Sequence, residues 1–519
     1  MAMNGAQALI RTLVDADVDV CFTNPGTSEM HFVAALDDVP QIRGVLGLAE
    51  GVVTGAADGY GRIADKPAAT LLHLGAGLSN GLANLHNARR ANTPIVNIIG
   101  DHATYHKRFD APLESDIEAV AGSLNGWMRR SSSTADIGTD TAAAIAAAQD
   151  APGRVATLIL PADVSWGEGG TPAATVPPTP PRTVASDVVR SVADVLRSGE
   201  PVALLFGGRA CRERGLRAVS RIAQATGAKP FAETFPARME RGAGLPNIER
   251  LGYLAEQVAY QLDGVRHVIL AGARSPVSFF AYPGKASDLV PEGARVHTLA
   301  EPADDVITAL EELADEVAAD VEPELAPAQR PELPTGELTP QNWAQVIGAL
   351  LPENAIISDE TNTSGLLVPM ATAGAPRHDV LTLTGGAIGQ GMAVATGAAI
   401  AAPDRPVINL EADGSAVYNI SSLWTQAREN LNVTTVVLNN RAYAILRMEL
   451  QRVGAESSGP KAKSLFDLST PDLDFVSMAE GFGVPATRAR TAEELADQFR
   501  RAVTTPGPHL IEAMVPPLL

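Results

Sequence analysis

PVINLEADGSAVYNISSLWTQARENLNVTTVVLNN, residues 406–440, is the part of the chain that most directly indicates the fold. A first apolar run ends at Asp413 and Gly414, a helix-like segment follows, and a second apolar run ends at Asn440. The 27 residues from Asp413 to Asn440 are the length of one strand–helix–strand crossover. Two neighbouring parallel strands would therefore carry a carboxylate and an amide side by side at their carboxyl ends.

Short apolar runs separated by helix-period segments recur along the whole chain. They include VDVCFTN (18–24), AATLLHL (68–74), PVALLFGG (201–208), NAIISDE (354–360) and HLIEAMV (509–515). Such runs are typical of parallel strands that are buried on both faces by helices. Two proline-rich stretches, 171–185 and 318–341, are predicted to be extended linkers. We therefore predict an α/β protein of three consecutive domains, each with a parallel sheet covered by helices on both faces, at residues 1–170, 186–317 and 338–519.

The composition excludes several classes of function. The 40 Lys and Arg residues against 60 Asp and Glu residues give a formal charge of −20, which repels nucleic acid and anionic membranes. Cys21 and Cys211 are too few for a disulfide scaffold or a Cys-rich metal site, and they favour a reducing, cytoplasmic location. No apolar run approaches the roughly 20 residues of a membrane span, and the first residues carry charge too early for a signal peptide. We therefore expect small molecules as ligands.

The polar residues at the strand ends are the first candidates for a binding site, because ligands of parallel sheets bind beyond the carboxyl ends of the strands. Asp413 and Asn440 would offer hard oxygen ligands without a nearby Cys or His, which suits Mg²⁺ or Ca²⁺. Gly414 would let a phosphate approach the backbone closely. On these residues alone a second interpretation stays open, in which Asp413 caps the next helix and the Asn pair forms a turn.

The same segment resembles a known family. EADGSAVYN followed by VVLNN is similar to the diphosphate-binding signature of thiamine-diphosphate enzymes, with Ala412 in place of its first glycine. Residues 420–447 resemble the corresponding part of benzoylformate decarboxylase and acetolactate synthase. The resemblance covers nearly the whole chain and implies a pyrimidine domain, a middle domain and a pyrophosphate domain. It also implies that thiamine diphosphate and Mg²⁺ are cofactors, with Asp413, Asn440 and the carbonyl of Ala442 as the metal ligands.

Two further segments are similar to cofactor-handling parts of that family. In GLAEGVVTGAADGYGR (47–62), Glu50 matches the glutamate that protonates the aminopyrimidine ring, so that the cofactor can lose its thiazolium proton. Without the resemblance, Glu50 would be an ordinary first-turn residue that complements the helix dipole. In GGAIGQGM (385–392), Ile388 matches the bulky residue that bends the cofactor, although plain core packing is its alternative. This segment is not a GxGxxG motif, which argues against a nicotinamide dinucleotide.

Matching positions elsewhere in the sequence complete the implied cofactor site. The resemblance assigns cofactor contacts to Asn24, Pro25, Gly26, Asn362, Thr363, Gly386, Gly414, Ser415 and Tyr443, besides Ile388, Asp413 and Asn440.

The substrate side is indicated by residues similar to those of benzoylformate decarboxylase. Thr27, in FTNPGTSEMHF, and His73, in TLLHLGAG, match catalytic positions, whereas a lone His on an apolar strand is otherwise usually a core residue. The second catalytic histidine of that decarboxylase has no counterpart, because ARSPVSFFAYPG (273–284) contains no His. Further candidates for the substrate pocket are His102, His106, Phe280, Leu446 and Glu449.

Glu449 falls where the decarboxylase has an aromatic pocket residue. An acid there could bind a polar substrate or handle a proton, and the alternative is a solvent-facing helical glutamate.

We therefore expect an enzyme that decarboxylates a 2-keto acid and ligates the resulting enamine to a second carbonyl, as acetolactate synthase does. The missing second histidine favours ligation over protonation. A decarboxylase of the benzoylformate type is one alternative, and a non-catalytic paralogue that binds the cofactor is another. We find no stretch typical of flavin contacts, so FAD is not expected. The resemblance implies a homodimer or homotetramer, since the glutamate and the diphosphate site of one pocket come from different subunits in the family.

Overall fold

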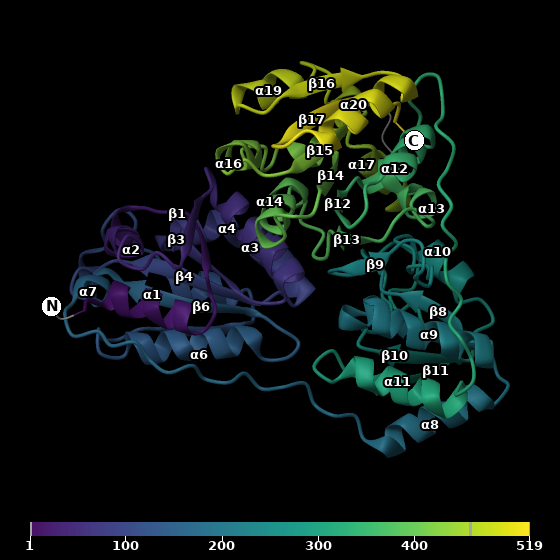
Figure 1. Cartoon of the computed structure of the whole chain (residues 1–519), viewed down its shortest axis with the longest axis horizontal. Helices are drawn as coiled ribbons and strands as arrows, with labels where there is room; N and C mark the ends of the chain where they lie inside the picture. Colours follow the sequence, from purple (N-terminus) through teal and green to yellow (C-terminus); the bar gives the residue numbers. More distant parts are fainter. Residues whose placement is uncertain (1–2, 456–458, 518–519) are drawn as a thin grey trace.

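The computed structural model describes residues 3–455 and 459–517, and these form three α/β units with one sheet each (Figure 1). In the first unit six parallel strands lie in the order β2-β1-β3-β4-β6-β5. The strands are β1 (Val20–Asn24), β2 (Arg43–Leu46), β3 (Ala68–His73), β4 (Ile95–Asp101), β5 (Trp127–Arg130) and β6 (Val155–Pro161).

Helices cover both faces of this first sheet. One face packs against α1 (Gly5–Asp15), α2 (Met30–Leu36), α6 (Ile137–Gln149) and α7 (Ala162–Trp166). The other face packs against α3 (Glu50–Ala64), α4 (Leu74–Ala91) and α5 (Ile117–Gly122). The strands form here because their apolar runs are buried on both sides, as in a parallel sheet.

The middle unit is a smaller parallel sheet with the order β11-β10-β7-β8. Its strands are β7 (Val202–Phe206), β8 (Lys229–Ala232), β10 (His267–Ala271) and β11 (Arg295–Ala300). Helices α8 (Ser186–Arg197), α9 (Glu213–Thr226) and α11 (Val306–Val317) pack on one face, and α10 (Ala255–Gln261) packs on the other.

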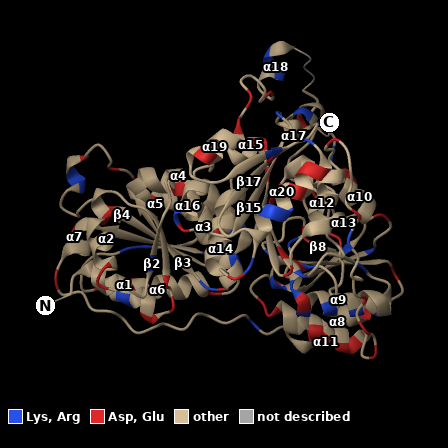
Figure 2. Ribbon diagram, turned by 45° about the horizontal axis from the view of Figure 1, so that its top comes forward, with Lys and Arg blue, Asp and Glu red and all other residues tan. Residues whose placement is uncertain are grey.

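Acidic segments of α11 lie beside basic segments of α8 and α9 (Figure 2), and three ion pairs join them: Arg197–Glu316, Arg214–Glu311 and Arg221–Asp315.

The third unit is a seven-stranded sheet in the order β16-β17-β15-β14-β12-β13-β9. Six parallel strands belong to it: β12 (Ala355–Glu360), β13 (His378–Thr382), β14 (Val407–Ala412), β15 (Val433–Asn439), β16 (Ala486–Ala489) and β17 (His509–Met514). The edge strand β9 (Met239–Arg241) comes from the middle part of the chain and pairs antiparallel with β13. The predicted parallel sheets are thus confirmed, with β9 as the exception.

Helices also cover both faces of the third sheet. One face packs against α12 (Asn342–Leu350), α13 (Val368–Ala371) and α20 (Ala492–Thr504), and the other against α14 (Gly391–Ala401), α16 (Ser422–Arg428) and α19 (Phe475–Gly481). The short helices α15 (Asp413–Ala416), α17 (Ala444–Arg452) and α18 (Pro460–Ser464) follow strand ends or loops.

The first and third units share a hydrophobic core where α3 crosses α14. Gly59 and Gly397 permit this crossing, because an added side-chain carbon at Gly59 would overlap the carbonyl oxygen of Val394, and one at Gly397 would overlap that of Ala56. The two backbones therefore approach more closely than side chains would allow.

A buried polar network at the end of α3 holds the same interface together. Arg62 pairs with Asp58 at 2.5 Å and donates to the carbonyl oxygen of Thr382 at 2.8 Å. Both charged side chains are almost completely buried, so each depends on the other for compensation.

Two extended segments connect the units, as the proline-rich stretches predict. Residues 171–185 run as a long strap from the first unit to α8, and residues 318–341 run from α11 to α12 (Figure 1). In the described ranges, the helices are all too short or too polar to cross a bilayer.

Candidate functional site

Asp413 lies at the carboxyl end of β14, where the strand turns into α15. Its side chain is 1% exposed and accepts hydrogen bonds from the backbone N–H groups of Gly414 at 2.8 Å and Arg441 at 2.6 Å. Burial raises the pKa of this carboxyl to about 6. No Lys or Arg side chain of the described ranges forms an ion pair with it. A buried carboxylate of this kind lacks a counter-charge, and a divalent cation would supply one.

Asn440 follows β15, which pairs in parallel with β14 so that both strand ends meet. Its side-chain oxygen accepts from the N–H of Ala442 at 2.9 Å, and its amide group donates to Ser364 at 3.4 Å. The loop 440–442 therefore folds over Asp413. The structure brings the predicted metal ligands Asp413, Asn440 and Ala442 together.

The chemistry of this donor set suits Mg²⁺. Within the described residues there is no cluster of three or more His, Cys, Asp or Glu side chains that could hold a metal. The set at the ends of β14 and β15 instead combines a single carboxylate with amide and carbonyl oxygens. Mg²⁺ is commonly held by one or two carboxylates together with substrate phosphates.

The residues predicted to contact the diphosphate gather around the same strand ends. Asn362 begins a short 3₁₀ helix after β12 and donates to the hydroxyl of Ser415 at 3.1 Å, and Thr363 follows in the same turn. A side-chain carbon on Gly414 would collide with the ring of Tyr443, so only glycine fits there. The segments 362–365, 413–416 and 440–443 thus form one cradle.

The loop between β13 and α14 carries Gly386 and Ile388. Gly386 has φ 76° and Gly389 has φ 94°, which are left-handed conformations that favour glycine. Glu360, at the end of β12, is buried and accepts from the N–H groups of Gly389 at 2.6 Å and Gly391 at 2.5 Å. This role of Glu360 was not predicted from the sequence, although the residue ends a predicted strand.

Glu411 lies beside Glu360 in the register of β12 and β14. Burial raises the pKa of Glu360 to about 7, and burial together with the charge of Glu360 raises the pKa of Glu411 well above its ordinary value. Two buried carboxyl groups on paired strands disfavour each other's ionisation.

Glu50 is the first residue of α3, as predicted. Its carboxylate accepts a hydrogen bond from Asn80 on α4 at 3.1 Å. The backbone carbonyl of the next residue, Gly51, accepts from Asn84 at 2.7 Å. The start of α3 is therefore fixed against α4.

Asparagines join the start of α3 to the loop between β13 and α14. Asn84 accepts from Asn87 at 3.2 Å, and Asn87 exchanges two hydrogen bonds with the backbone of Ala387, at 2.8 and 3.2 Å. Asn419 donates to the carbonyl of Gly389 at 2.6 Å. These contacts bring the Glu50 segment and the Ile388 loop of one chain into one region. None of these three residues was predicted from the sequence.

His73 ends β3 and is held by a residue that the sequence analysis also missed. Its Nδ1 lies 2.8 Å from Oε2 of Glu29, which also accepts from the N–H of Gly26 at 2.7 Å. Glu29 is fully buried, and burial raises its pKa although the charge of His73 acts against this. A side-chain carbon on Gly26 would collide with the His73 ring. The predicted Gly26 and His73 thus form one unit with Glu29.

The other predicted residues of the first unit have different surroundings. Thr27 is exposed at the start of a 3₁₀ turn, directly after Pro25 and Gly26. Asn24 donates to the carbonyl of Gly47 at 2.9 Å, so its side chain links the ends of β1 and β2.

His102 and His106 follow β4, and their ring centroids are 5.3 Å apart. Neither of the two rings is joined by a described contact to Glu50 or His73, so both remain substrate-pocket predictions.

Phe280, Leu446 and Glu449 lie on the side of the site that faces the middle unit. Phe280 packs against Phe279 at a centroid distance of 4.9 Å, and a side-chain carbon on Gly386 would collide with the Phe279 ring. Leu446 lies one turn before Glu449 on α17. The Glu449 side chain is only 13% exposed, so the interpretation of Glu449 as a solvent-facing helical residue is wrong.

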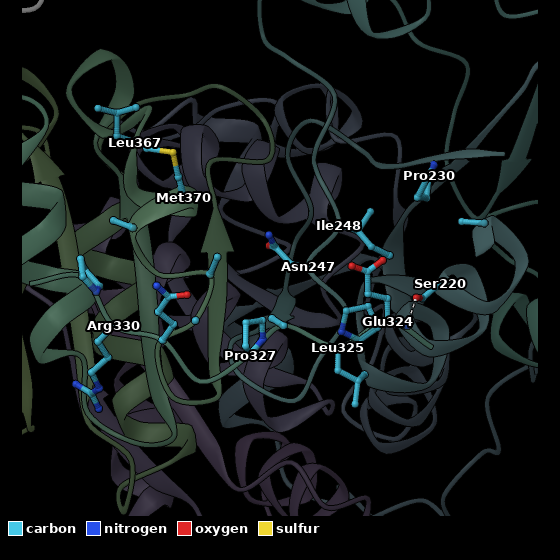
Figure 3. Close-up of a pocket in the computed structure, with 18 of the residues that line it drawn as sticks. Ser220, Pro230, Asn247, Ile248, Glu324, Leu325, Pro327, Arg330, Leu367 and Met370 are labelled. Atoms are coloured by element: carbon cyan, nitrogen blue, oxygen red, sulfur yellow. Dashed lines mark hydrogen bonds between the residues drawn. The ribbon is translucent and has the colours of Figure 1, made fainter. Parts of the chain in front are cut away.

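A cavity of about 730 Å³ lies elsewhere, between the middle unit, the strap 324–331 and helices α12 and α13 (Figure 3). Ser220, Asn247, Glu324, Arg330 and Met370 are among its lining residues. None of the predicted site residues lines this cavity. The cavity therefore does not coincide with the candidate site at the strand ends.

The sheets, the strand-end donor set and the glycine-bent loop define a cofactor enzyme of the thiamine-diphosphate class. Residues 3–121 match the N-terminal TPP binding domain of thiamine pyrophosphate enzymes, and residues 363–513 match their C-terminal TPP binding domain. The chain belongs to the thiamine pyrophosphate enzyme family, and the resemblance predicted from the sequence is confirmed.

Two relatives show where the chain falls within this family. It is 64% identical, over 100% of both chains, to a Mycobacterium tuberculosis protein provisionally named acetolactate synthase large subunit IlvX. It is 29% identical, over 95% of each chain, to benzoylformate decarboxylase of Pseudomonas aeruginosa.

Solved structures share the fold. The thiamine diphosphate-dependent 4-hydroxybenzoylformate decarboxylase of Rhodococcus jostii superposes with a TM-score of 0.84 at 24% identity, over 99% of each chain. Benzoylformate decarboxylase of Polynucleobacter necessarius superposes with a TM-score of 0.82 at 22% identity, over 100% of this chain and 99% of that one.

Proposed function

We propose that this enzyme uses thiamine diphosphate and Mg²⁺ to decarboxylate a 2-keto acid and to join the remaining acyl fragment to a second carbonyl compound. When bound, thiamine diphosphate supplies a carbon nucleophile and an electron sink for the departing CO₂. The buried, uncompensated Asp413 at the meeting strand ends is the observation that supports the cofactor assignment. Asp413, Asn440 and the carbonyl of Ala442 would hold the metal, and Asn362, Ser415 and Tyr443 would flank the diphosphate.

Glu50, Glu360 and His73 would each have a separate role in the reaction. Glu50 would hold a proton at its carboxyl group against the pyrimidine ring, with Asn80 fixing the orientation of the carboxyl. Glu360 holds the loop of Ile388 through two backbone N–H groups, so that the loop has one defined shape. With Glu29 ionised, Nδ1 of His73 donates to it, and Nε2 is then the nitrogen that exchanges a proton with substrate.

The absence of a second histidine is the observation that favours ligation. Residues 275–284 contain no His, and Phe279 lies there beside the Gly386 loop instead. A positioned general acid is typically worth about 10²–10⁴-fold in rate. Without that second histidine, release of an aldehyde is slowed, and the acyl fragment stays available to a second carbonyl.

A decarboxylase that releases free aldehyde is the second candidate. The Glu29–His73 pair favours it, because a histidine oriented by a buried carboxylate is a competent proton donor.

Product analysis distinguishes these candidates. The purified protein with thiamine diphosphate and Mg²⁺ is incubated with pyruvate and, separately, with benzoylformate, while CO₂ release is measured and products are identified by NMR. We expect more ligated product than aldehyde from at least one of the two. Aldehyde as the dominant product from both would support the decarboxylase, and cofactor binding without any CO₂ release would support the non-catalytic paralogue.

A further inference from the structure

A second, much smaller cavity lies where the edge strand β9 joins the third sheet (Figure 1). Its volume is about 10 Å³, which is room for roughly one water molecule. Arg241 and Arg250 line it from the middle part of the chain, and Asp359, Pro369 and Thr382 are among the residues that line it from the third unit. The cavity therefore lies in the joint between these two parts of the molecule.

Arg241 is a buried cation without a counter-charge. It is 8% exposed, and it forms no ion pair with an acidic side chain of residues 3–455 and 459–517. One terminal nitrogen donates to the carbonyl oxygen of Pro369 at 2.8 Å and to the side-chain oxygen of Asn247 at 3.0 Å, whereas the buried Nε has no hydrogen-bond partner. Burial, together with the charge of Arg250, lowers the pKa of Arg241 to about 10. Buried guanidinium groups are normally paired, so this one indicates a ligand.

Arg250 supplies a second unpaired cation to the same cavity. Its guanidinium group makes neither a hydrogen bond nor an ion pair among the residues that the structure describes. The carboxylate of Asp359 also lines the cavity, but it pairs with neither arginine, and its Oδ1 accepts from the N–H and the hydroxyl of Thr361 at 3.2 and 2.7 Å. The two arginines and the one carboxylate leave an excess of one positive charge, which a single monovalent anion would neutralise.

We propose that this cavity binds a single halide ion, chloride, between the guanidinium groups of Arg241 and Arg250. The excess positive charge repels a cation, and a polyatomic anion such as sulfate is larger than the room of about one water molecule. A halide accepts hydrogen bonds only, and Nε of Arg241 is a donor that no group of the protein uses. The proposal is independent of the reaction that the enzyme catalyses.

The position of the ion gives it a role in the joint between the units. Asp359 pairs in register with Thr382 on the neighbouring strand, and it precedes Glu360, whose carboxylate holds the cofactor loop. The hydroxyl of Thr382 donates to the carbonyl of Pro236 at 2.9 Å, and its own carbonyl accepts from Gln390 at 3.0 Å. A halide bound here therefore stabilises the contact between β9 and the part of the third sheet that supports this loop.

Diffraction from crystals of the holoenzyme grown in sodium bromide tests the site directly, because bromide replaces chloride and scatters anomalously. We expect an anomalous peak in the cavity, beside Nε of Arg241, and loss of this peak in Arg250→Gln. The measurement on the unmodified protein does not depend on how well the variant folds. A cavity that holds only water in the bromide crystals would overturn the proposal.

Thermal unfolding of the holoenzyme tests the site in solution, with sodium gluconate replaced stepwise by sodium chloride at constant ionic strength. An ion that binds only the folded protein raises the unfolding temperature with a saturating dependence on its concentration. We expect this dependence in the unmodified protein and its loss in Arg250→Gln. Arg266→Gln is the matched control, because Arg266 is an exposed arginine of the middle unit that does not line the cavity. An equal chloride dependence in the two variants would refute the proposal.

Asp359→Asn should change the same measurement in the opposite direction. The amide keeps an acceptor oxygen for Thr361 and removes the one negative charge that faces the ion. The chloride concentration that gives half of the maximal rise in unfolding temperature should therefore fall by about tenfold or more. An unchanged or higher concentration would contradict an anion bound beside Asp359.

Discussion

Asp413 shows at the scale of one residue how the structure can indicate a candidate site without its ligand. Its carboxylate is buried, bonded only to backbone N–H groups, and its pKa is raised to about 6. We predict that Asp413→Ala abolishes Mg²⁺-dependent binding of thiamine diphosphate, since a methyl group cannot ligate a metal. The fold should survive, because the variant removes a buried charge. Calorimetry with and without Mg²⁺ checks this, and normal holoenzyme formation would place the metal elsewhere.

Glu233 in the middle unit predicts a dependence of stability on pH. It follows β8 and accepts from the N–H of Gly208 at 2.8 Å, and burial raises its pKa from 4.5 to about 7. The folded protein keeps this proton up to about pH 7, while the unfolded chain releases it near pH 4.5. The stabilising contribution is therefore complete below pH 4.5 and is lost as the pH rises to about 7.

Glu233→Gln should remove this loss, because the amide keeps an acceptor for Gly208 and carries no charge. The side chain is partly accessible to water, so we expect a gain of about 1 kcal/mol at pH 8 and little change at pH 4.5. Urea denaturation of the two proteins at pH 8 and at pH 4.5 measures both changes in the free energy of unfolding. An equal effect at both would mean that ionisation of Glu233 is not the cause.

The crossing of α3 and α14 belongs to the scale of the elements. Gly59 lies against the backbone of Val394, with no room for a side chain. We predict that Gly59→Ala destabilises the protein by about 3 kcal/mol, since overpacking forces two helices apart. Gly122→Ala in α5 is the control, because its added carbon would meet nothing within 4 Å. Chemical denaturation should show a large decrease in the free energy of unfolding for Gly59→Ala and none for Gly122→Ala.

The elements that could be predicted from sequence are those with a local signal. Apolar runs located the long buried strands but not β5, β8, β11 or β16, whose side chains are partly exposed or polar. The 27-residue spacing located Asp413 and Asn440 at neighbouring strand ends. The resemblance then supplied Glu50 and His73, whose local patterns alone favoured ordinary structural roles.

The missed residues act through contacts that are distant in sequence. Glu29 is recognisable only by its contact with His73, 44 residues away, and Asn87 only by its bonds to Ala387. In the sequence, Glu411 is simply one residue of an apolar strand. Only the sheet register shows that it lies beside Glu360. Strand β9 is only three residues long, which is too short to show the alternating pattern of a strand in the sequence. It also lies in a part of the chain distant from the sheet that it joins.

At the scale of the whole molecule, we predict a homodimer or a homotetramer. Large apolar side chains are exposed on the first and third units: Tyr105 and Phe109 are each 62% exposed, Leu366 60% and Met370 68%. Exposed apolar groups of this kind mark interfaces, and in the family that the chain resembles, two subunits complete each cofactor pocket. Light scattering at assay concentration should give at least twice the 54.0 kDa of one chain. A fully active monomer would refute this prediction.

The edge strand β9 has a consequence for how this chain can change over generations. Genes of modular proteins recombine most easily where a break leaves two self-contained pieces. Here the linkers look like such break points, but a piece cut there would take β9 with it and strip the third sheet of its edge. Strand pairing is made by the main chain, so insertions or deletions at 239–241 would shift the register. Two side chains of the segment are also constrained, because Met239 is buried in the core of the middle unit and Arg241 donates to the carbonyl oxygen of Pro369 at 2.8 Å. We therefore expect descendants and chimaeras of this chain to conserve the length of that segment together with Met239 and Arg241.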